Sequence, residues 1–246
     1  MTQNDLIYCA IDTGDLTQAC DLAALLAPHC GIKLGLEFFN AFGPQGIDKV
    51  LNAAPAARLF IDLKYHDIPN TVAGAVRSLC RQFQPAYINV HASGGLEMMR
   101  AAVNSANDAT NGATKVLAVT LLTSLSEGDI AQIGYKTDAG TAQNGKAASN
   151  IPARVEGLAR LAQESGMAGV VCSSHEIEIL REACGHDFVL MVPGIRPAGS
   201  AASDQKRVMT PHEAVHLGAT HLVIGRPITE ADEPLAALHA ILESVQ

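Results

Sequence analysis

Short apolar segments recur along the chain and are separated by longer stretches with a helical pattern. Most of the short segments are nearly continuous in hydrophobic residues, which is typical of parallel strands covered on both faces. We interpret eight of them as strands, at residues 6–12, 32–35, 58–64, 87–92, 116–122, 169–173, 188–195 and 221–226. The pattern therefore predicts a buried parallel sheet flanked by helices.

Two of the intervening segments carry specific signals for the start of a helix. In "NTVAGAVRSLCRQF" the apolar residues fall on one helical face, and Asn70 or Thr71 stands where an N-cap belongs. The segment "TPHEAVHLGA" opens with Thr210 as N-cap, Pro211 as the first helical residue and Glu213 at the third position, which is a capping box. We therefore expect helices to begin at these two points.

Eight strands that alternate with helices over 246 residues fit a (β/α)8 TIM barrel, whose usual size is about 250 residues. A doubly wound open sheet is the alternative, but no G-x-G-x-x-G follows the first predicted strand. No low-complexity linker divides the chain, so we predict one domain over residues 1–246. The long interval between residues 122 and 169 holds a segment rich in Gly, Ala and Asn, which we interpret as a surface excursion.

Composition and charge narrow the possible functions. The formal net charge is −8 and Lys and Arg form no cluster, which argues against nucleic-acid binding. No segment approaches the roughly 18 apolar residues of a membrane span, and the N-terminus lacks the basic region of a signal peptide. Six scattered cysteines without a C-x-x-C pair argue against a zinc site and a disulfide framework. We therefore predict a cytoplasmic protein.

Polar side chains gather where the predicted strands end. In a TIM barrel the active site is built at the C-terminal ends of the strands. The polar residues at or near these ends are Asp12, Lys33, Asp62, Lys64, Asn89, His91, Thr120, Thr123, Arg196 and Arg226. So many polar groups in an otherwise apolar barrel mouth predict an active site there.

The densest of these clusters lies in "IDLKYHDIPNT", residues 61–71. Because side chains alternate along a strand, Asp62 and Lys64 share one face, and both point into the barrel if their neighbours pack on the helices. A structural ion pair at a strand end is the alternative. Lys33 and Asp12 favour a functional site, because a single structural pair needs neither of them.

The last two strands suggest a phosphate site. Loops after the seventh and eighth strands commonly bind phosphate in this fold. The segment "IGRP" offers backbone N–H groups at Gly225 and Arg226 together with a guanidinium group suited to phosphate. Residues 196–207 are rich in small side chains and are either a mobile lid over an anion or a plain surface loop.

These motifs together resemble the orotidine 5'-phosphate decarboxylase family. "DLKYHDIPNT" matches the family signature D-x-K-x-x-D-I-P-N-T, and Asp12, "IKLG", "INVHASGG", "LTS", "VPGIRP", "SDQKR" and "VIGRP" extend the likeness along nearly the whole chain. The D-x-K-x-x-D part alone is less specific, because related barrel sugar-phosphate decarboxylases and synthases share it. The resemblance implies decarboxylation of orotidine 5'-phosphate to UMP and CO2, the last step of de novo UMP synthesis, without metal or organic cofactor.

The resemblance also implies catalytic roles for matching positions. Lys64 would donate a proton to pyrimidine C6, and Asp62 would lie beside the substrate carboxylate. Lys33 and Asp67 would complete an alternating chain of charges. Family members are dimers, so Asp67 and Thr71 are expected to reach into the partner's site.

The other matching positions would bind substrate. They are Asp12 and Lys33 at the ribose, Thr123 near the base, Gln205 between base and phosphate, Gly225 and Arg226 at the phosphate, and Arg196 in the same substrate-binding set. Two histidines remain outside these sets. We expect His66 to pack or to form hydrogen bonds. His91 stands at a strand end next to the site, and we assign it no catalytic role.

Three other functions remain open. A metal-dependent enzyme acting on a sugar phosphate would need a further carboxylate near the second strand, where Glu37 follows Lys33. A non-catalytic phosphate-binding barrel would use Gly225 and Arg226, but it would not explain the cluster of Asp62, Lys64 and Asp67. A Schiff-base lyase would need Lys64 as an amine nucleophile, yet a lysine flanked by carboxylates keeps its proton.

Overall fold

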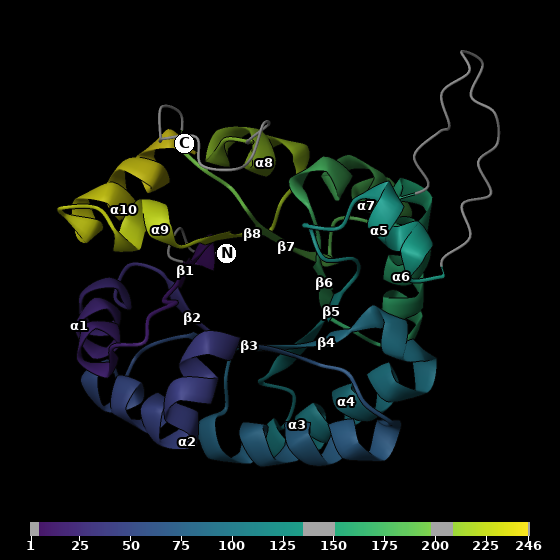
Figure 1. The fold of residues 1–246 in the computed structure, drawn as a ribbon, viewed down its shortest axis with the longest axis horizontal. Coiled ribbons are helices and arrows are strands. Elements are labelled where there is room, and N and C mark those ends of the chain that lie inside the picture. The colour runs from purple at the N-terminus through teal and green to yellow at the C-terminus, as the bar shows by residue number, and fades with distance from the viewer. Residues whose placement is uncertain (1–4, 135–150, 198–208, 246) are drawn as a thin grey trace.

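The computed structural model describes residues 5–134, 151–197 and 209–245. All neighbouring strands are parallel and each pairs with the next, and β8 pairs with β1 to close a barrel. The strands are β1 (Ile7–Ala10), β2 (Gly31–Gly35), β3 (Leu59–Tyr65), β4 (Tyr87–His91), β5 (Lys115–Val119), β6 (Gly169–Val171), β7 (Val189–Pro193) and β8 (His221–Ile224). The predicted (β/α)8 TIM barrel is confirmed (Figure 1).

Each of the eight apolar segments coincides with one strand, although β2 begins at Gly31 and β3 ends at Tyr65, one residue outside their segments, and some other strands end earlier than predicted. β5, for example, ends at Val119 rather than at residue 122. Asp12 and Arg226 consequently lie just beyond the ends of β1 and β8. Asp12 and Arg226 therefore belong to the barrel mouth, whereas Lys33, Asp62, Lys64 and Asn89 lie on the strands themselves.

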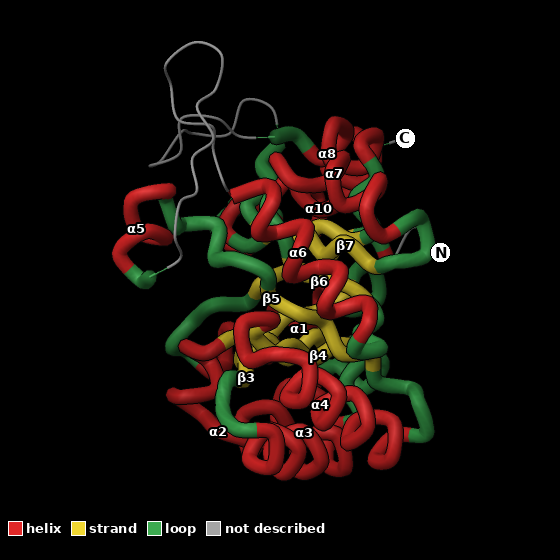
Figure 2. The backbone as a smooth tube through the Cα atoms, turned by 90° about the vertical axis from the view of Figure 1, so that its right-hand side faces the viewer, coloured by secondary structure: helices red, strands yellow, loops and turns green. Residues whose placement is uncertain are grey.

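Helices surround the barrel on all sides (Figure 1). The α-helices are α1 (Leu16–Leu26), α2 (Leu36–Ala53), α3 (Pro69–Phe83), α4 (Gly95–Thr110), α5 (Glu127–Gln132), α6 (Ile151–Glu164), α7 (Ile177–Cys184), α8 (Pro211–Leu217), α9 (Arg226–Thr229) and α10 (Pro234–Ser244). Two short 3-10 helices, η2 (Ala92–Gly94) and η3 (Ser174–Glu176), precede α4 and α7. Helix α5 stands out from the barrel on the side of its mouth (Figure 2). Within the described residues, no helix is both long and apolar enough to cross a membrane.

The two predicted helix starts have different outcomes. The capping box of α8 is confirmed, because the Thr210 side chain accepts from the Glu213 N–H and the Glu213 side chain accepts from the Thr210 N–H. The predicted cap of α3 is wrong, since that helix begins at Pro69 after Ile68 and has no side-chain cap. Proline fits the first helical position because its ring fixes a helical φ and its missing N–H needs no partner there.

The hydrophobic core has two parts. The larger lies between the barrel and its helices, and the smaller fills the barrel itself with Tyr8, Ala10, Phe60, Leu117, Met191 and Val223. The ring of Tyr8 lies so close to Gly31 that a Cβ there would come within 2.4 Å of it. These side chains pack the barrel interior beneath its mouth. The single domain predicted for residues 1–246 stays a prediction.

Candidate active site

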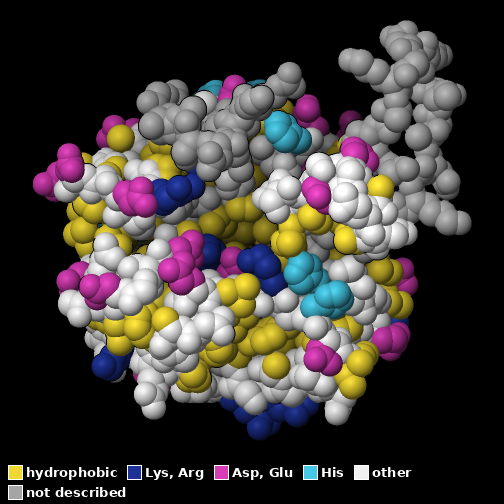
Figure 3. All heavy atoms as spheres, viewed as in Figure 1, with side chains coloured by type: hydrophobic (Ala, Val, Ile, Leu, Met, Phe, Trp, Pro, Cys, Tyr) yellow, Lys and Arg dark blue, Asp and Glu magenta, His cyan; other side chains and the backbone are white. Residues whose placement is uncertain are grey.

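A cavity of about 370 Å3 opens at the C-terminal ends of the strands. Acidic and basic side chains stand together in the central hollow of this face, with histidines near its edge (Figure 3). The sequence-predicted site residues that line the cavity are Asp12, Lys33, Asp62, Lys64, Thr123, Arg196, Gly225 and Arg226. The structure therefore brings together eight residues from six separate places in the sequence.

Four of these residues form a row of alternating charges, which we call the charge chain. Lys33 Nζ lies 3.2 Å from Asp12 Oδ1 and 3.4 Å from Asp62 Oδ2. Lys64 Nζ lies 2.6 Å from the other oxygen of Asp62. Each inner charge has a partner of opposite sign on both sides, which offsets the cost of removing it from water. Lys33, Asp62 and Lys64 belong to the predicted chain and Asp12 extends it, while the place of Asp67 in a partner's site stays a prediction.

Asp62 contacts both lysines of the charge chain, and only 8% of the residue is exposed. Burial by itself raises the pKa of Asp62. The charges of Lys33 and Lys64 and hydrogen bonds from Lys64 and Asn89 outweigh burial, so the pKa of this carboxyl lies below its usual range. Asp62 is therefore a fixed negative charge at neutral pH.

The backbone of Lys64 departs from a regular strand. Its φ is +49°, in the left-handed region that residues other than glycine rarely adopt. The pairing of β3 with β4 is irregular at this place, between Ile61 and Tyr65. Lys64 and Asp62 both line the cavity as predicted, but Lys64 reaches it through this irregularity and not through simple alternation.

Two residues of the site have no assigned role in the sequence-based prediction, although Asn89 is one of the polar residues at the strand ends. Asn89 on β4 is fully buried, and its side chain donates to Asp62 Oδ1 over 2.6 Å and accepts from the Lys64 N–H over 2.8 Å. Its signal in the sequence was a polar amide inside the apolar run "YINVHA". Gly35 on β2 is the second, because a Cβ there would lie 3.1 Å from both Asp12 Oδ1 and Lys33 Nζ.

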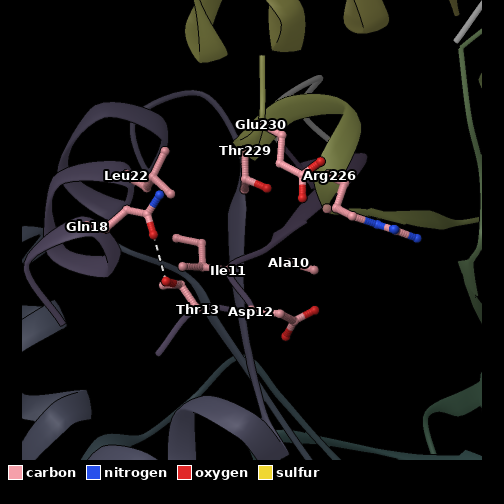
Figure 4. Close-up of a pocket in the computed structure, with 10 residues that line it drawn as sticks. Ala10, Ile11, Asp12, Thr13, Gln18, Leu22, Arg226, Thr229 and Glu230 are labelled. Carbon is pink, nitrogen blue, oxygen red and sulfur yellow. Dashed lines mark hydrogen bonds between the residues drawn. The ribbon is translucent and has the colours of Figure 1, made fainter. Parts of the chain in front are cut away.

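The side of the cavity near β8 is suited to an anion. Gly225 follows β8, and Arg226, whose side chain is exposed, begins α9. A second cavity, of about 260 Å3, adjoins this point and also contacts Asp12 (Figure 4). On its far side the Thr13 hydroxyl donates to Gln18 Oε1 over 2.6 Å. An exposed guanidinium beside a glycine backbone can bind a phosphate group.

Two predicted site residues do not line the cavity in this chain. Asp67 and Thr71 are exposed and do not line it. Asp67 Oδ1 instead accepts a hydrogen bond from the N–H of Ile68, over 2.6 Å. Gln205 lies outside the described residues, as does most of the predicted lid at 196–207.

The two histidines near the charged cluster face each other. The ring centroids of His66 and His91 lie 5.4 Å apart. Burial, followed by the charges of His66 and Lys64, lowers the pKa of His91 against an opposing effect of Asp62. His91 is therefore electrostatically linked to the charge chain. His66 is exposed, and its ring packs on that of His91.

The ligand set of the metal-dependent alternative is not seen in the described part of the chain. Glu37, the carboxylate that follows Lys33, is exposed in the first turn of α2 and does not line the cavity. No group of three or more His, Cys, Asp or Glu residues that could hold a metal ion occurs among residues 5–134, 151–197 and 209–245.

Fold and site together define a (β/α)8-barrel enzyme with lysines and carboxylates paired at the C-terminal ends of its strands. The profile of the "Orotidine 5'-phosphate decarboxylase / HUMPS family" matches residues 5–241, and the chain belongs to this family.

Individual relatives are named orotidine 5'-phosphate decarboxylase. The orotidine 5'-phosphate decarboxylase of Paramagnetospirillum magneticum is 47% identical over 236 residues, which cover 94% of each chain. That of Moorella thermoacetica is 42% identical and covers 100% of this chain and 94% of its own. The solved structure of orotidine 5'-phosphate decarboxylase from Lactobacillus acidophilus superposes with a TM-score of 0.79 at 32% identity, over 99% of both chains.

Proposed function

We propose that this protein decarboxylates orotidine 5'-phosphate to UMP and CO2, with Lys64 as the proton donor to C6. The carrying observation is the contact of Lys64 Nζ with Asp62 Oδ1, 2.6 Å long, at the cavity in the barrel mouth. The names of the full-length relatives support this reaction over the sugar-phosphate alternative.

The chemistry needs a cation at one fixed place. When the bond between C6 and the carboxyl group breaks, CO2 leaves and the electron pair stays on C6, where no carbonyl group delocalises it. An ammonium group already held beside C6 stabilises that pair without reorganising. Lys64 then transfers a proton from Nζ to C6, and its neutral amine regains a proton from solvent. Neither a metal nor an organic cofactor takes part in these steps.

The rest of the charge chain holds this cation and receives the sugar. Asp62 holds the ammonium group of Lys64 in place and lies beside the substrate carboxylate. Lys33, 7% exposed, ties Asp62 to Asp12 and leaves Asp12, which is exposed, free to accept from a ribose hydroxyl. Thr123 contacts the base.

The phosphate group of the substrate lies away from the reacting carbon, and its contacts with the protein contribute binding energy. Gly225 and Arg226 bind the phosphate, and Arg196 lines the same cavity. Gln205 links base and phosphate. Because the phosphate takes no part in bond breaking, its binding energy can order the residues around C6.

A second copy of the chain completes each site. Asp67 and Thr71 are exposed next to Ile68, whose residue is 66% exposed. Because neither side chain lies in the cavity of its own chain, both remain accessible to a second copy. In the homodimer Asp67 and Thr71 of one protomer reach the cavity of the other, and Asp67 extends the charge chain. The protein works in the cytoplasm, in the last step of pyrimidine nucleotide synthesis, and binds neither nucleic acid nor membrane.

The test is to add orotidine 5'-phosphate to the purified protein and to follow its ultraviolet absorbance, with and without excess EDTA. We expect conversion to UMP at a rate that EDTA leaves unchanged. Loss of activity on chelation that Mg2+ restores would favour the metal-dependent alternative. Absence of any turnover, with UMP still bound, would favour a phosphate-binding barrel.

A further inference from the structure

The pairing of β3 with β4 contains two extra residues on β3. Ile61 pairs with Ile88 and Tyr65 with Val90, so β3 advances four residues while β4 advances two. Asp62 and Lys64 both lie inside this bulge. Bulges bend a strand and redirect its side chains, and they often occur beside active sites.

A side chain takes the place of the missing backbone partner. The Lys64 N–H donates to Oδ1 of Asn89 over 2.8 Å. Because this N–H can only donate, it must meet the amide oxygen of Asn89, and the amide NH2 group is then turned to the other side. There it donates to Asp62 Oδ1 over 2.6 Å.

Asn89 therefore contacts both Lys64, the proposed proton donor, and Asp62, the carboxylate that holds its ammonium group. The Asp62 oxygen that it contacts is the same one that accepts from Lys64 Nζ. Asn89 itself is completely buried and both ends of its amide have partners. A buried amide is costly unless it is fully hydrogen-bonded, and an apolar residue would fill the same space without that requirement.

We infer that Asn89 is a positioning residue for proton transfer, which holds the backbone of Lys64 and the carboxylate of Asp62 in one fixed relation. Through the backbone it keeps Lys64 in its left-handed conformation, and through Asp62 it fixes where the ammonium group rests. This inference rests on the proposed role of Lys64 as proton donor.

Asn89→Asp separates the two contacts, because the shape and the acceptor for the Lys64 N–H remain. The NH2 group becomes a carboxylate oxygen placed where Asn89 Nδ2 now lies 2.6 Å from Asp62 Oδ1. Two carboxyl groups at this separation share one proton, and raising the pH removes it and makes them repel. Relative to wild type at each pH, we expect kcat of this variant to fall at least about tenfold between pH 6 and pH 8, with KM changed by less than about threefold.

Asn111→Asp is the matched control. Asn111 is an exposed asparagine with a left-handed φ of +52° that ends α4, and this variant should follow the wild-type pH profile. A kcat for Asn89→Asp that equals wild type, or that falls by one constant factor at every pH, would overturn the inference.

A second variant covers the case in which Asn89→Asp does not fold. Asn89→Ala loses both contacts, and we expect kcat to fall about 100-fold while the Kd for UMP stays within about threefold of wild type. Wild-type kcat in Asn89→Ala would also overturn the inference. Failure of the proposed function has a different signature: the wild-type protein would not turn over orotidine 5'-phosphate, or Lys64→Ala would retain wild-type turnover, whatever the Asn89 variants do.

Discussion

Lys64 and Arg226 line the same cavity but differ in their surroundings. Lys64 Nζ is held 2.6 Å from the buried carboxylate of Asp62, whereas the Arg226 side chain is exposed at the start of α9. The first arrangement suits a charge that develops in the transition state, and the second suits a charge that the substrate already carries. The two residues should therefore affect different kinetic constants.

We predict that Lys64→Ala lowers kcat at least about 10³-fold, because it removes both the fixed cation and the proton donor. Binding of UMP should stay near the wild-type level. Arg226→Ala should instead weaken UMP binding and lower kcat/KM by about 10- to 100-fold, the value of a charge-assisted phosphate contact. Steady-state kinetics and UMP titration measure both effects.

Lys115→Ala is the control for these two variants, since Lys115 is exposed at the start of β5, at the opposite end of the barrel. It should leave kcat and UMP binding unchanged. Equal loss of UMP binding in the Lys64 and Arg226 variants would contradict the division of roles.

At the scale of elements, a buried histidine joins three parts of the barrel floor. His221 begins β8, and its Nε2 lies 2.9 Å from the hydroxyl of Tyr87, the first residue of β4. Its Nδ1 lies 2.6 Å from the carbonyl oxygen of Asp5, before β1. Because a carbonyl only accepts, Nδ1 carries a proton, and in the neutral ring Nε2 accepts from the Tyr87 hydroxyl. A neutral ring therefore satisfies both contacts.

Burial, and then the charge of Arg58, lower the pKa of His221 to about 4. The unfolded chain binds a proton near pH 6.5, the ordinary value, so between pH 6.5 and 4 it holds more protons than the folded chain. We predict that the free energy of unfolding falls by about 3 kcal/mol from this group as pH drops through that window, and that its contribution is constant below pH 4. Urea unfolding at pH 7.5 and pH 4.5 measures the change.

His221→Gln isolates this contribution, because glutamine offers one donor and one acceptor but does not titrate. The variant should lose less stability than wild type over the same pH interval. An identical pH dependence in the two proteins would show that His221 does not cause it.

At the scale of the whole molecule, Asp67 decides whether one chain makes a complete site. It lies three residues past Lys64, a span of at most about 10 Å, so the chain alone allows it to turn back or to reach across an interface. In the structure it is exposed and accepts from the N–H of Ile68, away from the charge chain. Both features agree with a role in a partner's site.

We predict that Lys64→Ala and Asp67→Ala chains, each inactive alone, regain activity when unfolded, mixed and refolded together. In a mixed dimer one site lacks both residues, while the other combines an intact Lys64 with the partner's intact Asp67. Random mixing makes about half of the dimers mixed, so about a quarter of wild-type activity should return in a twofold-symmetric dimer. Activity of the refolded mixture measures it.

Each variant refolded alone is the control for this experiment, and subunit exchange is verified with differently tagged chains. Exchange without recovery of activity would place Asp67 in the site of its own chain.

The sequence alone determined the barrel and the end of it that carries the charges. Strands buried on both faces must be continuously apolar, so each such segment marked a strand, and the polar residues that follow marked the mouth. The spacing of Asp62 and Lys64 and the capping box at Thr210 were also visible, because both are local patterns. The start of α3 was misjudged, since a proline at the first helical position competes with two good capping residues.

Only the tertiary structure decided which side chains meet. Ala10 pairs with Lys33 across β1 and β2, and this register brings Asp12 to the Lys33 amine although 21 residues separate them. The bulge in β3 likewise turns Lys64 into a left-handed conformation and gives its N–H to Asn89, 25 residues away. Hydrophobic periodicity reports how far each residue is buried but not which residue lies across from it, because strand register depends on the packing of the whole barrel.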